Sequence, residues 1–154
     1  MNTALSRAPF HPRRILVPLD FSGQSRQAFR CAVPLAEKFG ASILLVHVIP
    51  PPVYAATDLA LAPPNAAAQR AAARRRLTTT ATAGIPPGVK VRAVIREGHP
   101  AREILAVARR HKVGLVVIST KGRTGIRRLL LGSTAEYVVR HALCPVLAVR
   151  RQSD

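Results

Sequence analysis

One stretch constrains the fold of this chain more than any other. Four consecutive apolar residues, Leu115–Ile118, are followed by Ser119, a basic loop with glycines, and a segment that opens on Gly132. A continuous run of branched apolar residues is typical of a strand that is buried on both faces of a parallel sheet. Glycines leave backbone N–H groups accessible, and the start of a helix favours anions. The stretch therefore predicts a strand, an anion-binding loop and a helix in that order.

The loop and the helix start also have an ordinary structural interpretation. Ser133 and Glu136 have the spacing of a capping box, which stabilises the first turn of a helix without any ligand. Glycines in a loop can simply turn the chain. The residues that carry the anion-site hypothesis are Lys121, Gly122, Arg123, Gly125 and Gly132.

Length and charge limit the classes of protein to consider. A chain of 154 residues fits one domain. Lys and Arg number 24 against seven acids, a formal charge of +17, which indicates either an anionic partner or a solvated basic surface. Two Tyr, four Phe and no Trp are too few aromatic residues for a typical single-strand stacking surface. Nucleic-acid binding therefore stays a minor alternative.

The N-terminus and the cysteines indicate the compartment. Arg7, Arg13 and Arg14 are not followed by an apolar segment, so we expect no secretory signal. No run is apolar and long enough to span a bilayer. Cys31 and Cys144 form neither a disulfide framework nor a metal set, and we expect them to be small buried apolar residues. A cytoplasmic location is the simplest expectation.

Hydrophobic periodicity predicts alternating strands and helices. Residues 1–12 read as a loose leader before a single domain over 13–151, in which 50–88 form an excursion of loop and Ala-rich helix. Connections long enough for right-handed crossovers favour a mainly parallel α/β sheet. The predicted strands are 14–20, 42–49, 89–96, 115–118 and 145–149; the predicted helices are 25–39, 65–83, one that starts near 100, and 133–141.

Asp20 is the acidic residue placed best for a binding role. It follows the first predicted strand, and ligands of parallel α/β sheets bind beyond the carboxyl ends of strands. Its carboxylate suits a ribose hydroxyl or a water-mediated share of a magnesium ion. It also suits a turn cap that accepts the N–H groups of Ser22 and Gly23. Walker A, Gly-x-Gly-x-x-Gly, Gly-x-Ser-x-Gly and His-Glu-x-x-His motifs are absent from the sequence.

Over residues 14–150 the chain resembles the universal stress protein family. The resemblance rests on Ile15–Ser22, Leu45–Val48, Gly132–Glu136 and Cys144–Leu147. It implies an α/β, Rossmann-like fold of the adenine nucleotide alpha hydrolase type. In that fold a five-stranded parallel sheet in the order 3-2-1-4-5 carries helices on both faces.

The family's nucleotide motif, Gly-x2-Gly-x9-Gly-Ser/Thr, is matched except at its first position. Gly122, Gly132 and Ser133 fit, whereas Ser119 stands where the first glycine is expected. Serine keeps the N–H group but crowds the approach to a ligand. The resemblance implies that a nucleotide lies against Pro18, Asp20, Val48, Ser119, Thr120, Lys121, Gly122, Arg123, Thr124, Gly125, Gly132, Ser133, Thr134 and Ala135.

The function implied by the resemblance is that of an ATP-binding regulatory module of the stress response. ATP with magnesium would be its ligand, with at most slow hydrolysis because no base is evident to activate water. A homodimer through the 145–149 edge strand is implied as well. The alternatives are a member that binds no nucleotide and acts through dimerisation and protein partners, and a basic nucleic-acid-binding protein.

Overall fold

Strands and helices alternate along the whole chain in the computed structural model, which describes residues 10–51, 66–120 and 131–150. The described elements are β1 (Arg14–Pro18), α1 (Gly23–Phe39), β2 (Ser42–Ile49), α2 (Ala66–Thr82), β3 (Val91–Glu97), α3 (Pro100–Arg110), β4 (Leu115–Ser119), α4 (Ser133–His141) and β5 (Val146–Val149).

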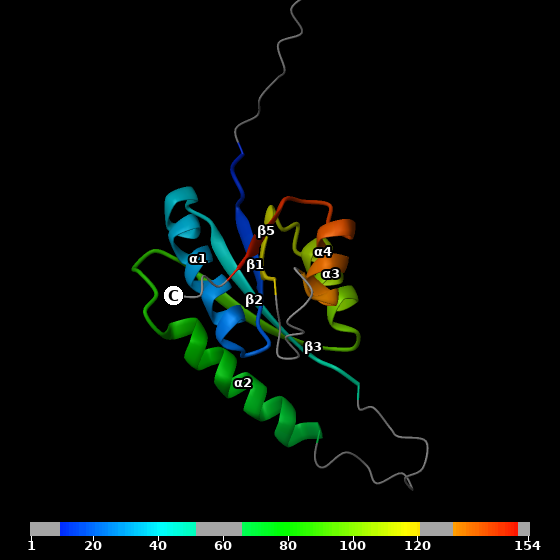
Figure 1. The fold of residues 1–154 in the computed structure, drawn as a ribbon. Helices are drawn as coiled ribbons and strands as arrows, with labels where there is room; N and C mark the ends of the chain where they lie inside the picture. Colours follow the sequence, from blue (N-terminus) through cyan, green and yellow to red (C-terminus); the bar gives the residue numbers. More distant parts are fainter. Residues whose placement is uncertain (1–9, 52–65, 121–130, 151–154) are drawn as a thin grey trace, which may run out of the picture.

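The strands form one parallel sheet in the order β3-β2-β1-β4-β5 (Figure 1). In register, Ile15 of β1 lies between Ile43 of β2 and Leu115 of β4. The predicted α/β, Rossmann-like fold and its strand order are therefore confirmed. Because β1 and β4 are neighbours, the chain segments that follow them leave the sheet at the same edge.

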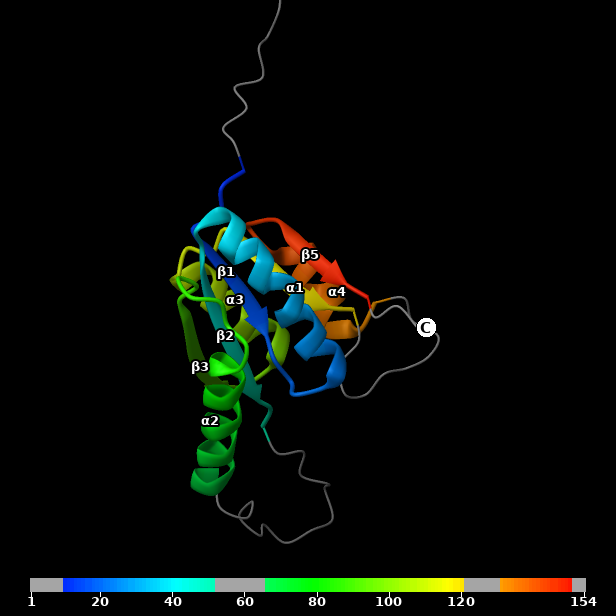
Figure 2. The same ribbon diagram turned by 90° about the vertical axis from the view of Figure 1, so that its left-hand side faces the viewer.

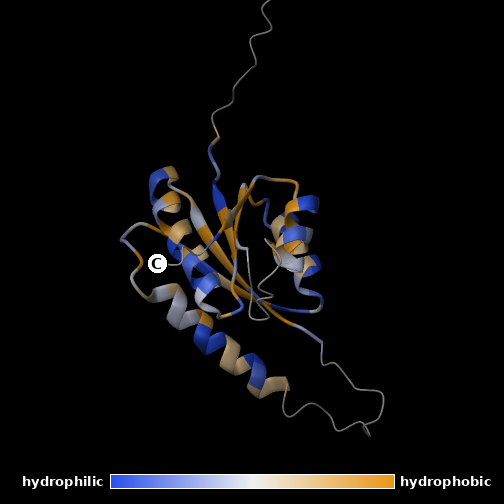
Figure 3. Ribbon diagram, viewed as in Figure 1, coloured by the Kyte–Doolittle hydropathy of each residue, from blue (hydrophilic) through white to orange (hydrophobic). Residues whose placement is uncertain are grey.

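Helices cover both faces of the sheet, α1 and α2 on one and α3 and α4 on the other, as the two orthogonal views show (Figures 1 and 2). The alternation of side chains along β1 explains why both faces are apolar. Ile15 and Val17 pack in the core under α1, and Leu16 packs in the core under α3. Apolar residues line the sheet and polar residues cover the outer helix faces (Figure 3).

Two residues set the bounds of α1. The Ser22 hydroxyl accepts the backbone N–H of Ser25 at 3.1 Å as an N-cap, so the helix begins two residues before the predicted start. Gly40 ends it in a left-handed conformation with φ +59°, as predicted, and Ala41 N–H bonds to Ala36 O at 2.8 Å.

Helix α2 is attached to the fold by few apolar contacts. Of its residues, only Ala73 and Leu77 are buried. Its threonines form hydrogen bonds with the backbone of their own helix. Thr78 donates its hydroxyl proton to Arg74 O at 3.0 Å. Thr79, Thr80 and Thr82 make equivalent bonds. Residue 65, the predicted start of this helix, lies outside the described residues, as does most of the predicted loop between β2 and α2.

Several predicted boundaries shift by one or two residues. Strand β1 ends at Pro18, two residues before the predicted end. Leu19 N–H still bonds to Val46 O at 2.8 Å, and the backbone then turns at Phe21. Strand β3 begins at Val91, since Val89 N–H is engaged in a turn with Pro86 O at 3.3 Å. Strand β5 begins one residue later than predicted, at Val146.

Two sequence expectations about single residues need correction or extension. Cys31 and Cys144 are free thiols that are partly exposed rather than fully buried. Residues 1–9 of the predicted leader lie outside the described residues, while Phe10 packs edge-on against Phe39 with ring centroids 5.8 Å apart. Within the described part of the chain, no helix combines the length and the apolar character needed to cross a membrane.

Candidate functional site

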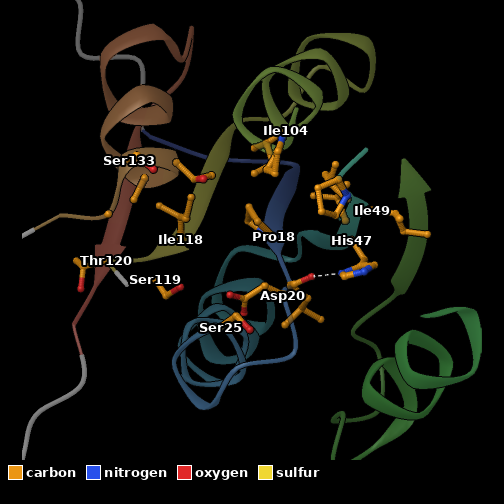
Figure 4. Close-up of a pocket in the computed structure, with 18 of the residues that line it drawn as sticks. Pro18, Asp20, Ser25, His47, Ile49, Ile104, Ile118, Ser119, Thr120 and Ser133 are labelled. Carbon is orange, nitrogen blue, oxygen red and sulfur yellow. Dashed lines mark hydrogen bonds between the residues drawn. The ribbon is translucent and has the colours of Figure 1, made fainter. Parts of the chain in front are cut away.

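A cavity of about 420 Å³ opens at the carboxyl edge of the sheet, where β1 and β4 diverge (Figure 4). Small-molecule sites in proteins commonly have volumes of about 300–1,000 Å³, and parallel α/β sheets bind ligands at this edge. The lining comes from the ends of β1, β2 and β4 and from the first turns of α1, α2, α3 and α4. Its residues are Pro18, Leu19, Asp20, Ser25, Val46, His47, Val48, Ile49, Pro50, Gln69, Pro100, Ile104, Ile118, Ser119, Thr120, Gly132, Ser133, Thr134 and Ala135.

Asp20 places a half-buried carboxylate in this cavity. One carboxylate oxygen, Oδ1, accepts the backbone N–H of Ser22 at 2.9 Å. The turn-capping role weighed from the sequence is therefore real for Ser22. It does not exclude a ligand, because a carboxylate has about four acceptor positions. Within the described residues no group of three or more His, Cys, Asp or Glu side chains could hold a metal ion.

The N-terminus of α4 forms the opposite wall. The predicted capping box is wrong, because Gly132 rather than Ser133 is the N-cap, and glycine has no side chain to cap the first turn. Glu136 instead makes an ion pair with Arg140 at 2.8 Å. The first N–H groups of a helix lack partners within the helix, and the helix dipole favours anions there. This wall therefore suits a phosphate or another anion.

Two serines, Ser25 and Ser119, line the same cavity as Asp20 (Figure 4). Ser25 is 2 % exposed and Ser119 is 9 % exposed. Ser25 donates its hydroxyl proton to Ser22 O at 3.2 Å and accepts the Ser22 hydroxyl at 3.3 Å, which leaves one further acceptor position on its oxygen. Together with the Asp20 carboxylate, the two hydroxyls make a polar corner between β1 and β4.

The remaining lining is largely apolar. Pro18, Val48, Ile104 and Ile118 come from β1, β2, α3 and β4 and converge from different sides. His47 lies beside them, and its Nδ1 is 2.6 Å from the Leu19 carbonyl oxygen. A carbonyl only accepts, so Nδ1 carries the proton. His47 is therefore a hydrogen-bonded residue of β2 that also lines the cavity.

Nine of the predicted site residues are among those that the structure describes, and it brings them together. Pro18, Asp20, Val48, Ser119, Thr120, Gly132, Ser133, Thr134 and Ala135 all line the cavity. The other five predicted residues, Lys121, Gly122, Arg123, Thr124 and Gly125, lie outside the described residues.

Sequence reasoning missed several lining residues. Ser25 was overlooked because a serine in an amphipathic helix gives no signal of its own, although it sits one turn after Asp20. Ile104 is buried on α3, and helical spacing alone does not distinguish a cavity-lining residue from a core residue. Gln69 reaches the site through the position of α2, which no local pattern encodes.

Comparison with known proteins adds the family context. The model of the universal stress protein family matches residues 11–150. A universal stress protein of Methanocaldococcus jannaschii is 32 % identical over 144 residues, which covers 90 % of this chain and 82 % of that protein. The structure of the universal stress protein UspA from Lactobacillus plantarum is 30 % identical and has a TM-score of 0.67. The match covers 89 % of this chain and 97 % of that one.

Two further solved structures contain nucleotides. A universal stress protein in complex with cAMP is 24 % identical, with a TM-score of 0.61 and 90 % of this chain covered against 97 % of that one. The universal stress protein from Archaeoglobus fulgidus in complex with dAMP is 19 % identical, with a TM-score of 0.65 and coverages of 88 % and 95 %. At these identities the likeness shows the shared fold.

Proposed function

Because this chain belongs to the universal stress protein family, we propose that it is a regulatory protein of the stress response whose cavity binds an adenine nucleotide, ATP in particular. The observation that carries the proposal is the N-terminus of α4. Its N-cap, Gly132, has no side chain to occupy the first N–H groups, and it lines the same cavity as Asp20. An anion-favouring wall and a hydroxyl-binding carboxylate are the two groups that a nucleotide needs. The cAMP and dAMP complexes of family members support the choice of adenine.

Each part of ATP has a matching part of the cavity. The base packs against the apolar lining around Pro18 and Val48. The ribose hydroxyls meet the polar corner of Asp20 and Ser119, and the phosphates meet residues 132–135. Lys121–Gly125 complete the phosphate side in this proposal, which rests there on the sequence motif alone.

Magnesium would accompany the phosphates in this site. Asp20, the acidic residue among the described lining residues, faces the ribose in this proposal, so a magnesium ion would be held by the phosphates and keep most of its waters. The described lining offers no second carboxylate to act as a base toward water. We therefore expect hydrolysis to be slow at most and the protein to act by binding.

A homodimer through β5 is part of the proposal. Strand β5 lies at the edge of the sheet, and an exposed apolar edge strand tends to pair with another chain. Leu147 on β5 is 41 % exposed, and Leu143 just before the strand is 85 % exposed. A second copy of this chain would cover both side chains. We place the protein in the cytoplasm.

The distribution of charge favours one secondary function, contact with a nucleic-acid duplex. Arg14, Arg92, Arg110, His111 and Lys112, which we call the cationic edge, lie at the end of the sheet opposite the cavity. Among the described residues, Glu97, Glu103 and Glu136 are paired with arginines at the cavity end. Clustered cations at one edge of the sheet suit the closely spaced phosphates of a duplex.

Calorimetric titration of ATP with magnesium at two salt concentrations tests the main proposal, after the purified protein is shown to carry no nucleotide. We expect saturable binding of one ATP per chain that persists at the higher salt. Binding that vanishes with salt, or no binding, would contradict the proposal. A member that acts through its dimer and protein partners would then be the better description.

A further inference from the structure

Phe21 has an unusual backbone conformation next to the proposed ligand-binding carboxylate. Its φ is +64°, and among the described non-glycine residues only Lys112 also has a positive φ. A bulky side chain disfavours this left-handed region, so surrounding contacts must hold it there. Such strain concentrates at functional sites, which directs attention to what keeps Phe21 in place.

Three contacts hold Phe21. Its ring lies 4.4 Å from the His47 ring between centroids, and the Arg76 guanidinium carbon lies 4.0 Å from the Phe21 centroid. Its carbonyl oxygen accepts Arg26 Nη1 at 3.1 Å. His47 is fixed in turn by the hydrogen bond from Nδ1 to the Leu19 carbonyl. The contacts therefore join α1, α2 and β2 to the turn after β1.

Asp20 lies in the chain between Leu19 and Phe21, and both of these residues contact His47. On one side His47 binds the Leu19 carbonyl, and on the other Phe21 packs against the His47 ring. The left-handed turn at Phe21 brings the Ser22 N–H to Asp20 Oδ1, where it donates at 2.9 Å. The direction of the Asp20 carboxylate thus depends on the conformation of Phe21.

Helix α2 reaches this turn through Arg76. Because Ala73 and Leu77 are the only buried residues of α2 and Ala81 adds a partly buried contact, the polar contacts of this helix matter for its position. Arg70 makes an ion pair with Glu97 at the end of β3, and Arg76 makes the cation–π contact with Phe21. A displacement of α2 would remove a contact that holds the turn.

We propose that Phe21 is a positioning residue for Asp20 and that α2, through Arg76, regulates how well the cavity recognises a ribose. This inference rests on the proposed nucleotide site. It predicts that the Arg76 contact affects ligands with a ribose and leaves the binding of bare phosphates unchanged. A partner that moves α2 would thereby change nucleotide affinity without touching the cavity.

A matched pair of arginine variants tests the inference. Arg76→Gln removes the cation over Phe21, and Arg75→Gln removes the charge of its exposed neighbour, for which the structure gives no ring contact. An exposed cation–π contact corresponds to roughly a two- to fivefold change in an equilibrium constant. We expect Arg76→Gln to weaken ATP binding about two- to fivefold and to leave binding of inorganic triphosphate unchanged. Phe21→Leu should weaken ATP binding at least as much.

The control and a second readout keep the outcomes distinct. If Arg76→Gln and Arg75→Gln have the same ratio of ATP to triphosphate affinity, the inference is wrong. If the wild-type protein binds no ATP, the proposed function fails. Hydrogen exchange of the Ser22 amide in the free protein then tests whether Arg76 on α2 is coupled to the Asp20 turn. Faster exchange in Arg76→Gln than in Arg75→Gln supports the link from α2 to the Asp20 turn, and equal exchange overturns it.

Discussion

The backbone N–H of Gly132 donates a 2.6 Å hydrogen bond to the carbonyl oxygen of Thr120. This bond joins the end of β4 to the N-cap of α4, two positions that are separated by the basic loop in the sequence. It places Ser119 and the first turn of α4 on the same cavity. The bond therefore fixes the start of α4 relative to the end of β4.

Thr134→Asp should separate phosphate binding from helix stability. A negative charge in the first turn of α4 favours the helix dipole, so we expect thermal stability to be retained. The same charge repels a nucleotide phosphate at the cavity wall, and we expect ATP affinity to fall at least about tenfold. Thr79→Asp, which adds the same charge on α2 outside the cavity, should leave ATP affinity nearly unchanged. Equal losses in both variants would show that net charge alone governs binding.

Two substitutions of Asp20 separate its turn-capping role from its proposed ligand role. Asp20→Asn keeps an oxygen that can accept the Ser22 N–H, whereas Asp20→Ala removes it. We expect both variants to weaken ATP binding about tenfold, because a charged hydrogen-bond acceptor for the ribose contributes about 1.5–3 kcal/mol. Asp20→Ala alone should also lower the melting temperature. Equal loss of ATP and inorganic triphosphate affinity would refute the ribose assignment.

Elements with strong local patterns could be predicted from the sequence. Ser42–Ile49 matches the predicted strand at both ends, because a run of apolar residues follows the glycine cap of α1. In α3, Ile104, Leu105, Val107 and Ala108 are buried as their helical spacing predicts. The proximity of Asp20 to residues 119 and 132–135 follows from strand order, and the order itself came from the family resemblance.

Features that depend on tertiary contacts were not accessible in this way. The left-handed Phe21 needs partners from β2 and α2, so its neighbours in sequence do not encode it. Helix α4 begins at Ser133 as predicted, but its N-cap is Gly132, whose N–H bonds to Thr120 O. The Ser and Glu spacing reflects a local preference for capping at Ser133, whereas the N-cap in the structure lies one residue earlier.

Leu147→Lys tests the proposed dimer. Leu147 is exposed on the edge strand β5, and a lysine there opposes pairing because its charge would be buried between two copies. We expect the dimer dissociation constant to rise at least about tenfold with little change in the melting temperature of the monomer. Sedimentation velocity over a range of concentrations measures the constant. A wild-type protein that is monomeric at all concentrations would contradict the dimer proposal.

His111 reports on the cationic edge. Its pKa lies below 6.5 because burial, and then the charges of Arg14, Arg110 and Arg92, disfavour the imidazolium. The unfolded chain binds the proton more readily, so this group lowers stability as the pH falls from 6.5 toward the folded-state pKa. Arg92→Gln removes one opposing charge and should raise the pKa of His111. Titration of the imidazole by NMR measures the change, and an unaltered pKa would show that Arg92 does not act on this site.

The duplex-binding function makes a prediction that net charge alone does not. Arg92→Gln/Arg110→Gln and Arg30→Gln/Arg75→Gln each remove two positive charges, but only the first pair lies on the cationic edge. Each lost phosphate contact lowers the slope of log affinity against log salt by about 0.9, so the first pair should lower it by about 2. The second pair should leave the slope nearly unchanged. Binding should also strengthen below pH 6.5, because bound phosphate favours protonated His111. Fluorescence anisotropy with a labelled random duplex measures both effects, and equal slopes for the two pairs would reduce duplex binding to a general consequence of the +17 charge.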